Sequence, residues 1–302
     1  MPRKIQSDFN AQLKKVRGLY RRANRVRFGQ GVAEGPQAVR ELVTARPDLV
    51  RDIYATELAL ASHPDIARAV VDADFFLHVL PDSLFSEITD TGQGILGVYT
   101  IPDEPSLDDV LSNEKLVVMG LGTSDPGNAG TIMRSADGAG AGAVIFSQGS
   151  VECSNPKVVR ASTGSYFHIP FIEDDDAVDV VLAARSYGFQ VLIADAGGEM
   201  DLARLEDYAL LAFLERHSEA LARDAFGALL NTASDCDRTI VDLSRPTLWV
   251  FGNEAHGFTA DELKLADARV RVPMWGNTES LNLGVAASLC IFASAKAQHR
   301  AH

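Results

Sequence analysis

From Lys115 onward the chain alternates short apolar runs with segments of helical spacing, and this rhythm constrains the fold more than any other feature of the sequence. The runs KLVVMGL, AVIFSQ, FQVLIADA and TLWVFGN read as strands, whereas TIMRSADGAG and AVDVVLAARSYG have helical character. Strands that are apolar throughout and alternate with helices are typical of a parallel sheet covered on both faces. We therefore predict an α/β domain over residues 115–302. Residues 199–240 read as a helical insertion that is longer than a usual crossover.

The first third of the chain predicts a second, smaller α/β unit. Residues 8–26 have helical spacing, and helix and strand signals then alternate as far as the strand-like run ILGVYTI. The segment IPDEPSLDDVLSNE follows, with two prolines and several acids, and reads as a linker. A chain of 302 residues is long enough for two domains. We place the first at residues 1–105.

Charge is distributed unevenly along the chain. The formal net charge is −13, yet Met1 to Arg27 holds nine Lys or Arg and one acid, so this segment carries +8 and the remainder −21. Such asymmetry suggests a basic arm on an acidic body. Charge alone leaves two interpretations open, a solvated helix face or a surface that grips phosphates.

Several classes of protein are disfavoured by what the sequence lacks. No stretch has 18 uninterrupted apolar residues, and the start MPRKIQSDFN has no apolar signal region, so we expect neither a membrane span nor secretion. The three cysteines have no CxxC or Cys/His ligand spacing, so we expect a cytoplasmic protein without a metal site.

Polar residues gather directly after the predicted strands of the second domain, in SDPGNAGTIMR, FGNEAHG and TESLN. Because ligands of parallel sheets bind beyond the carboxyl ends of the strands, we expect these loops to face one another. They offer backbone groups and few charges, which suits a neutral heterocycle with a polar tail. The candidate site residues are Asn128, Arg134, Glu254, Ser280 and Asn282.

Two other site types find little support. No Ser–His–Asp or paired-acid arrangement indicates hydrolysis. The candidate nucleotide loop, Gly120-Leu-Gly122, lacks the third glycine of a dinucleotide fingerprint, and there is no Walker A sequence. A small-molecule oxidoreductase with an atypical nucleotide loop remains an alternative.

The three clusters resemble the three motifs of the SpoU branch of the SPOUT RNA ribose methyltransferases. The matching stretches are DPGNAGTIMRSADGAGAGAVIF, LWVFGNEAHGF and VRVPMWGNTESLNLGVAASLCIFA, and PKVVRASTGSYFHIP is similar to the family's connecting segment. The resemblance implies a mostly parallel α/β domain tied in a trefoil knot, an exception to the rule that folds are unknotted. It also implies a homodimer whose active sites lie near the dimer interface. S-adenosylmethionine would bind bent in the knot, without a metal. By position, the cofactor-binding residues are Gly252, Val272, Leu281 and Asp195.

The reaction implied is methyl transfer from a sulfonium to a ribose 2′-hydroxyl. The family's counterpart of Arg134 is linked to removal of the hydroxyl proton. A guanidinium is hardly ever deprotonated, so a grip on the adjoining phosphate that stabilises developing oxyanion charge is physically easier. The resemblance assigns to Asn128, Glu254, Ser280 and Asn282 the orientation of the ribose and of Arg134.

The first domain resembles the ribosomal-protein-like RNA-binding domain that many SpoU enzymes carry. The stretches RVRFGQGVAEGPQAVREL and ITDTGQGILGVY carry this resemblance. It makes the basic segment an expected RNA contact. The residues expected to touch RNA are Arg25, Arg27, Gln93 and, on the connecting segment, Arg160, which is also placed to reach the cofactor carboxylate.

The function that we expect is methylation of a ribose 2′-hydroxyl in structured RNA. The accessory domain favours ribosomal RNA, in particular the 23S species, over tRNA. The alternatives are a tRNA ribose methyltransferase and a non-catalytic RNA-binding dimer on the same scaffold. The sequence does not specify the nucleotide, or whether the modification is a housekeeping one or confers antibiotic resistance.

Overall fold

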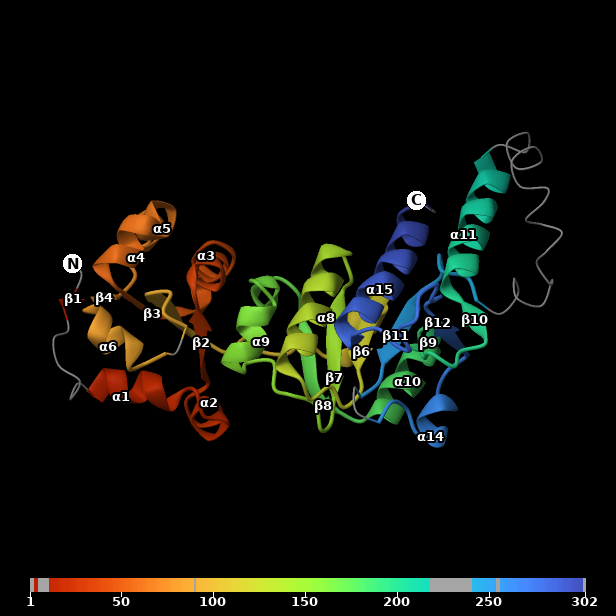
Figure 1. Cartoon of the computed structure of the whole chain (residues 1–302), viewed down its shortest axis with the longest axis horizontal. Helices are drawn as coiled ribbons and strands as arrows, with labels where there is room; N and C mark the ends of the chain where they lie inside the picture. Colours follow the sequence, from red (N-terminus) through yellow and green to blue (C-terminus); the bar gives the residue numbers. More distant parts are fainter. Residues whose placement is uncertain (1–2, 5–10, 90, 218–240, 254–255, 301–302) are drawn as a thin grey trace. The chain divides into compact units, whose positions relative to one another are not determined.

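The computed structural model describes residues 3–4, 11–89, 91–217, 241–253 and 256–300 (Figure 1). The chain forms two compact units. Unit 1 comprises Met1–Glu104 and Glu152–His168, and unit 2 comprises Pro105–Val151 and Ile169–His302. The boundary at Glu104 falls inside the segment that reads as a linker, but the rest of that segment forms helix α7 (Leu107–Asn113).

Unit 1 contains a five-stranded mixed sheet in the order β1-β4-β3-β5-β2. Strand β5 runs antiparallel to both of its neighbours, β3 and β2, whereas β4 pairs in parallel with β3 and β1. The strands are β1 (Arg3–Lys4), β2 (Gln30–Glu34), β3 (Val50–Ala55), β4 (Leu77–Val79) and β5 (Ile95–Thr100).

Helices cover both faces of this sheet, because apolar side chains alternate between the faces along each strand. On one face, Ile53 and Ile95 meet helices α3 (Pro36–Ala45), α4 (Glu57–Ser62) and α5 (Pro64–Asp72). On the other face, Tyr54 and Leu96 meet α1 (Ala11–Gly18) and α6 (Asp82–Ser86).

The basic N-terminal segment is part of this folded unit. It forms α1 and α2 (Arg22–Phe28), and three of its apolar residues are buried in the core, namely Leu13, Val16 and Leu19. The expectation of an arm is therefore corrected over residues 11–28. The apolar residues of α1 anchor that helix to the sheet, whereas the buried residue of α2 is Arg25.

The segment Glu152–His168 belongs to unit 1, although it connects two strands of the unit 2 sheet. Its helix α9 (Pro156–Ala161) lies against β2. Unit 1 is thus assembled from two stretches of chain that are far apart in sequence.

Unit 2 contains a seven-stranded sheet in the order β10-β12-β9-β11-β6-β7-β8, and every pair in it is parallel. This confirms the fold class expected from the apolar runs; the threading of the C-terminal segment through a knot stays a prediction. The strands are β6 (Leu116–Gly120), β7 (Ala143–Ser147), β8 (Phe171–Asp175), β9 (Gln190–Ala194), β10 (Met200–Asp201), β11 (Thr247–Phe251) and β12 (Ala268–Arg271).

Two helix layers cover the unit 2 sheet. One face meets α7 and α10 (Ala177–Ser186) through an aliphatic cluster that includes Met119, Ile145 and Ile193. The other face meets α8 (Pro126–Gly138) and α15 (Leu283–Arg300), which lie side by side (Figure 1). Trp249 on β11 is fully buried beneath α15 and donates a hydrogen bond to Ser294 Oγ at 2.9 Å.

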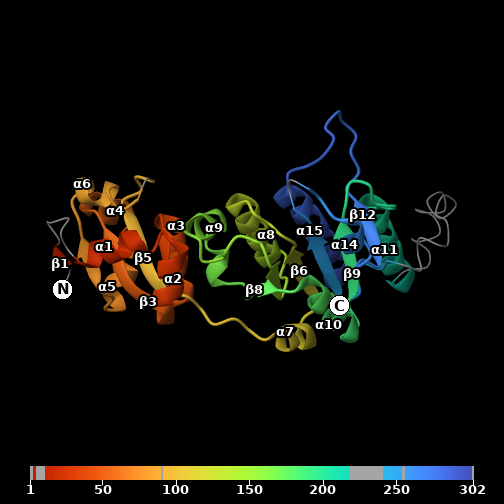
Figure 2. The same ribbon diagram turned by 90° about the horizontal axis from the view of Figure 1, so that it is seen from below.

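The predicted insertion begins with helix α11 (Leu202–His217), and residues 218–240 lie outside the described residues. A short helix, α14 (Ala260–Leu263), precedes β12. The connection between β12 and α15 projects from the rest of unit 2 (Figure 2). Within the described residues, no helix combines the length and the apolar character needed to cross a membrane.

Candidate functional site

The loop after β6 is shaped by a helix cap. Asp125 accepts a hydrogen bond from the backbone N–H of Asn128 at 2.8 Å, and Pro126 occupies the first turn of α8, where its missing N–H costs nothing. This cap fixes Asn128 in the first turn of the helix. Its side chain is largely buried, with the residue 8% exposed.

The start of α15 meets this turn. Asn282 Nδ2 donates a hydrogen bond to Asn128 Oδ1 at 2.8 Å, and Asn282 Oδ1 accepts from the N–H of Val285. The helices approach so closely here that a Cβ at Gly284 would lie 2.7 Å from the side chain of Thr131. The hydrogen bond between Asn282 and Asn128 therefore joins two polar clusters directly, although the two residues are 154 positions apart in the sequence.

A cavity of about 660 Å³ opens beside this contact, at the carboxyl ends of β9, β11 and β12. Six predicted site residues line it: Asn128, Asp195, Val272, Ser280, Leu281 and Asn282. Its remaining wall combines apolar groups with Asn253, Arg271, Met274 and Glu279. The expectation that the loops converge at one edge of the sheet is met for all three clusters, the second being represented by Asn253.

Two predicted residues are placed differently, and the position of a third is not described. Gly252 does not line the cavity, although its neighbour Asn253 does. Arg134 is exposed on α8, two turns beyond Asn128, and is not part of the cavity wall. Glu254 lies outside the described residues.

The charged groups at the cavity are partly neutralised by their neighbours. Arg271 donates to the carbonyl of Gly198 at 3.1 Å and to Asp201 at 3.2 Å. Asp195 Oδ2 lies 3.8 Å from the guanidinium of Arg269. A cavity with amide groups, two carboxylates and apolar patches can hold a ligand with a flat apolar part and a cationic polar tail.

These properties fit S-adenosylmethionine, whose adenine is flat and whose sulfonium and amino groups are cationic. The volume lies within the usual range of about 300–1,000 Å³ for small-molecule sites. The described residues contain no group of three His, Cys, Asp or Glu that could hold a metal ion.

Sequence reasoning missed two residues that shape this site. Asn253 Nδ2 donates to the carbonyl of Gly122 at 2.6 Å and so ties the loop after β11 to the loop after β6. Asp125 caps α8. The signal for Asp125 was present, because an Asp before Pro and Gly at a helix start indicates an N-cap; nothing local indicates the partner of Asn253.

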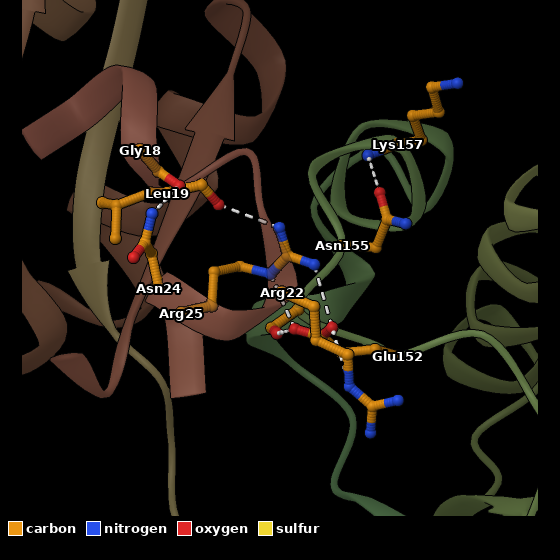
Figure 3. Close-up of polar contacts among 9 residues, drawn as sticks. Gly18, Leu19, Arg22, Asn24, Arg25, Glu152, Asn155 and Lys157 are labelled. Atoms are coloured by element: carbon orange, nitrogen blue, oxygen red, sulfur yellow. Dashed lines mark hydrogen bonds and ion pairs between the residues drawn. The ribbon is translucent and has the colours of Figure 1, made fainter. Parts of the chain in front are cut away.

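The residues expected to touch RNA fall into two groups. Arg25 is buried, donates two hydrogen bonds to Glu152 at 2.6 and 2.9 Å, and donates a third to the carbonyl of Leu19 (Figure 3). Arg160 donates to the buried carboxylate of Glu34 at 2.9 Å. Both arginines pair with a carboxylate of unit 1, although Arg160 itself is exposed.

Arg27 and Gln93 are exposed, and neither is part of an ion pair among the described residues. Gln93 lies against the turn at Gly35, where a Cβ would come within 2.0 Å of its Oε1 atom. The glycine, with a φ of +91°, is thus required both by its backbone conformation and by this close approach.

Comparison with known proteins extends these observations to the whole chain. A 23S rRNA (guanosine(2553)-2′-O)-methyltransferase of Bacillus subtilis is 25% identical over 296 residues, which cover 96% of this chain and 98% of that protein. The mitochondrial rRNA methyltransferase 3 of Mus musculus is 32% identical over 225 residues, which are 67% of this chain but 52% of that protein.

Solved structures share the fold. An rRNA methyltransferase from Sinorhizobium meliloti with bound AdoMet superposes with a TM-score of 0.72 at 23% identity, over 97% of each chain. The model of the SpoU rRNA Methylase family matches residues 115–292, which include the cavity and the joined clusters. The chain belongs to the SpoU rRNA methylase family.

Proposed function

We propose that this protein is an S-adenosylmethionine-dependent methyltransferase that modifies a ribose 2′-hydroxyl of 23S rRNA. The observation that carries the proposal is the hydrogen bond between Asn128 and Asn282 at the wall of a 660 Å³ cavity, because it unites the first and third family motifs around one hollow. The B. subtilis relative, which matches over nearly its full length, supports the choice of rRNA.

The cofactor is assigned to this cavity. Val272 and Leu281 offer backbone groups and apolar side chains to the adenine, and Asp195 offers a carboxylate to the polar part. Gly252 lies next to the cavity wall rather than in it, so its assignment to the cofactor passes to Asn253. S-adenosylmethionine, when bound, supplies a methyl group on an electron-poor sulfur.

The chain's own residues then orient the acceptor. The ribose hydroxyl must lie in line with the methyl group and the sulfur, and holding two reactants in that geometry is itself a large part of catalysis. Asn128, Ser280 and Asn282 are placed at the cavity to hold the ribose. Glu254 keeps its expected orienting role as part of the proposal.

Arg134 is assigned to the phosphate beside the reacting sugar, where its charge stabilises the oxyanion that develops as the hydroxyl loses its proton. It lies outside the cavity of the single chain. We therefore place it in a homodimer, whose active sites the family resemblance locates near the interface. The protein is expected to act in the cytoplasm.

The test is methylation in vitro. Purified protein is incubated with methyl-labelled S-adenosylmethionine and, in parallel, with 23S rRNA transcript and bulk tRNA transcripts, and ribose methylation is mapped by mass spectrometry. We expect one 2′-O-methylated nucleotide in 23S rRNA. Methylation of tRNA alone would mean that tRNA, and not 23S rRNA, is the substrate. Absence of S-adenosylmethionine binding by calorimetry would favour a non-catalytic RNA-binding dimer.

A further inference from the structure

Some basic residues in and between α1 and α2 form ion pairs with carboxylates, and others do not. Arg17 pairs with Glu87, and both Arg25 and Arg22 contact Glu152, the latter at 3.5 Å (Figure 3). Among the described residues, Lys15, Arg21 and Arg27 have no carboxylate within ion-pair distance, and all three are exposed. In a chain with 41 acidic residues, such free cations call for an explanation.

Two of the free cations converge on one aromatic ring. Lys15 Nζ lies 5.0 Å from the centroid of the Phe28 ring, and Arg27 Cζ lies 5.2 Å from it. The ring is 41% exposed, and its neighbour Val26 is 70% exposed. A cation over an aromatic face is attracted by the ring quadrupole, so Phe28 holds both charges at one place on the surface.

The position of these cations near helix C-termini does not explain their convergence. Lys15 lies in the last turn of α1 and Arg27 in the last turn of α2, where the helix dipole favours positive charge. The dipole acts on each helix separately, however. It gives no reason for two like charges from different helices to share a ring, because their mutual repulsion opposes the arrangement in the free protein.

An anionic ligand would relieve that repulsion. We propose that Lys15 and Arg27, positioned by Phe28, form a phosphate-binding site for the backbone of the RNA substrate. The proposal rests on the proposed function, which supplies the RNA. Arg25, expected from sequence to touch RNA, is excluded from this site by its bonds to Glu152. The site selects phosphate rather than base sequence, since ammonium and guanidinium groups pair with any phosphate.

The experiment measures affinity for 23S rRNA transcript over a series of KCl concentrations, for wild type, Lys15→Ala, Arg27→Ala and the double variant. Each phosphate contact contributes about 0.7 to 0.9 to the slope of log K against log salt. We expect the slope to fall by about that amount in each single variant and by about twice that in the double variant.

Arg46→Ala is the matched control, because it removes the same charge from a half-buried residue of unit 1 that is already paired with Asp48. Its slope should equal that of wild type. An unchanged slope in Lys15→Ala and Arg27→Ala, or an equal loss in Arg46→Ala, would overturn the proposal.

Phe28→Leu and Phe28→Tyr test the positioning role. In the Phe28→Leu background, removing Lys15 or Arg27 should lower RNA affinity less than it does in wild type. In the Phe28→Tyr background, the same substitutions should lower RNA affinity as much as they do in wild type. If Phe28→Leu lowers the thermal midpoint, the Lys15 and Arg27 variants, both at exposed positions, decide the matter alone.

The two proposals fail in different ways. Wild-type protein that methylates no RNA yet shows the predicted salt slopes refutes the function and keeps the phosphate site. Wild-type protein that methylates 23S rRNA with the same salt slope in every variant refutes the phosphate site alone. Binding of anionic phospholipid vesicles that is lost in the two variants, with RNA affinity unchanged, would reassign the site.

Discussion

In unit 1, Arg25 and Glu152 close on each other and leave no charge exposed, whereas in unit 2, Asn128 and Asn282 meet at the wall of an open cavity. Both contacts join residues that are far apart in sequence, by 127 and 154 positions. The first pairs opposite charges with the side chains 3% and 11% exposed, and so saturates both groups. The second pairs neutral amides at a cavity wall, so no charge has to be compensated there.

The difference shows how a polar residue of a family motif is to be interpreted. A buried arginine with a bidentate carboxylate partner builds the fold, because a buried charge is tolerated only when it is paired. A neutral amide beside a cavity carries no charge that must be paired, so it can orient a substrate at little cost. The partner and the burial decide the role, and neither can be read from the residue type.

Arg25→Ala should have the largest effect on stability. It leaves Glu152 half-buried and without its main partner, and breaking a buried pair costs about 3–5 kcal/mol. Urea unfolding followed by circular dichroism should show the loss. Both tryptophans lie in unit 2, so their fluorescence reports unit 2 separately. Arg40→Ala, which breaks a solvent-exposed pair with Asp65, should cost far less.

The same ion pair predicts a pH dependence. Burial raises the pKa of Glu152, but hydrogen bonds from Arg25 and Ser154 outweigh it and hold the pKa below its ordinary value near 4.5. The stabilisation is therefore fully present above pH 4.5 and is lost as the pH falls through the lower, folded-state pKa. Arg25→Ala should flatten this acid limb; an unaltered limb, or an unaltered urea midpoint, would contradict the role of the pair.

Arg134→Ala should have the largest effect on activity. Removing one group that stabilises the developing oxyanion typically lowers kcat by about 10²–10³-fold. The residue is exposed, so the thermal midpoint and the affinity for S-adenosylmethionine should stay close to wild type. Steady-state methylation of 23S rRNA transcript, with calorimetry for the cofactor, measures both. Full turnover by the variant would remove Arg134 from the mechanism.

Asn282→Ala should have an intermediate effect. It removes the hydrogen bond to Asn128 and the cap on the N–H of Val285, which together are worth about 1–2 kcal/mol. We expect the loss of this free energy to lower kcat/KM for RNA by about tenfold. A double-mutant cycle with Asn128→Ala isolates the contact. Strictly additive effects of the two substitutions would show that the amides act independently.

The sequence predicted the unit 2 sheet well because a strand that is buried on both faces is apolar along nearly its whole length, as in the runs KLVVMGL and TLWVFGN. It also predicted that the loops carrying Asn128 and Asn282 would face one another, because parallel strands bring their carboxyl ends to one edge. Both inferences depend on periodicity and topology, which are local or nearly local properties.

The partner of Arg25 could not be predicted. Arg25 and Arg27 stand two residues apart in the same basic run, yet Glu152 contacts only the first, and it is 127 residues away. The exclusion of Arg134 from the cavity was within reach of the sequence. A helix turns by about 100° per residue, so a separation of six residues places Asn128 and Arg134 roughly 120° apart around α8.

Trp275→Phe should have the smallest effect and should sharpen the view of the cavity. Trp275 is 88% exposed on the projecting connection before α15 (Figure 2), next to Met274 of the cavity wall, whereas Trp249 is fully buried. The substitution should change stability by no more than about 0.5 kcal/mol. S-adenosylmethionine should alter the emission of wild type, because ordering the cavity wall changes the surroundings of Trp275, and should leave the emission of the variant constant. A response that persists in Trp275→Phe would arise from Trp249, and would mean that the ligand reaches the packing beneath α15 rather than the cavity at its start.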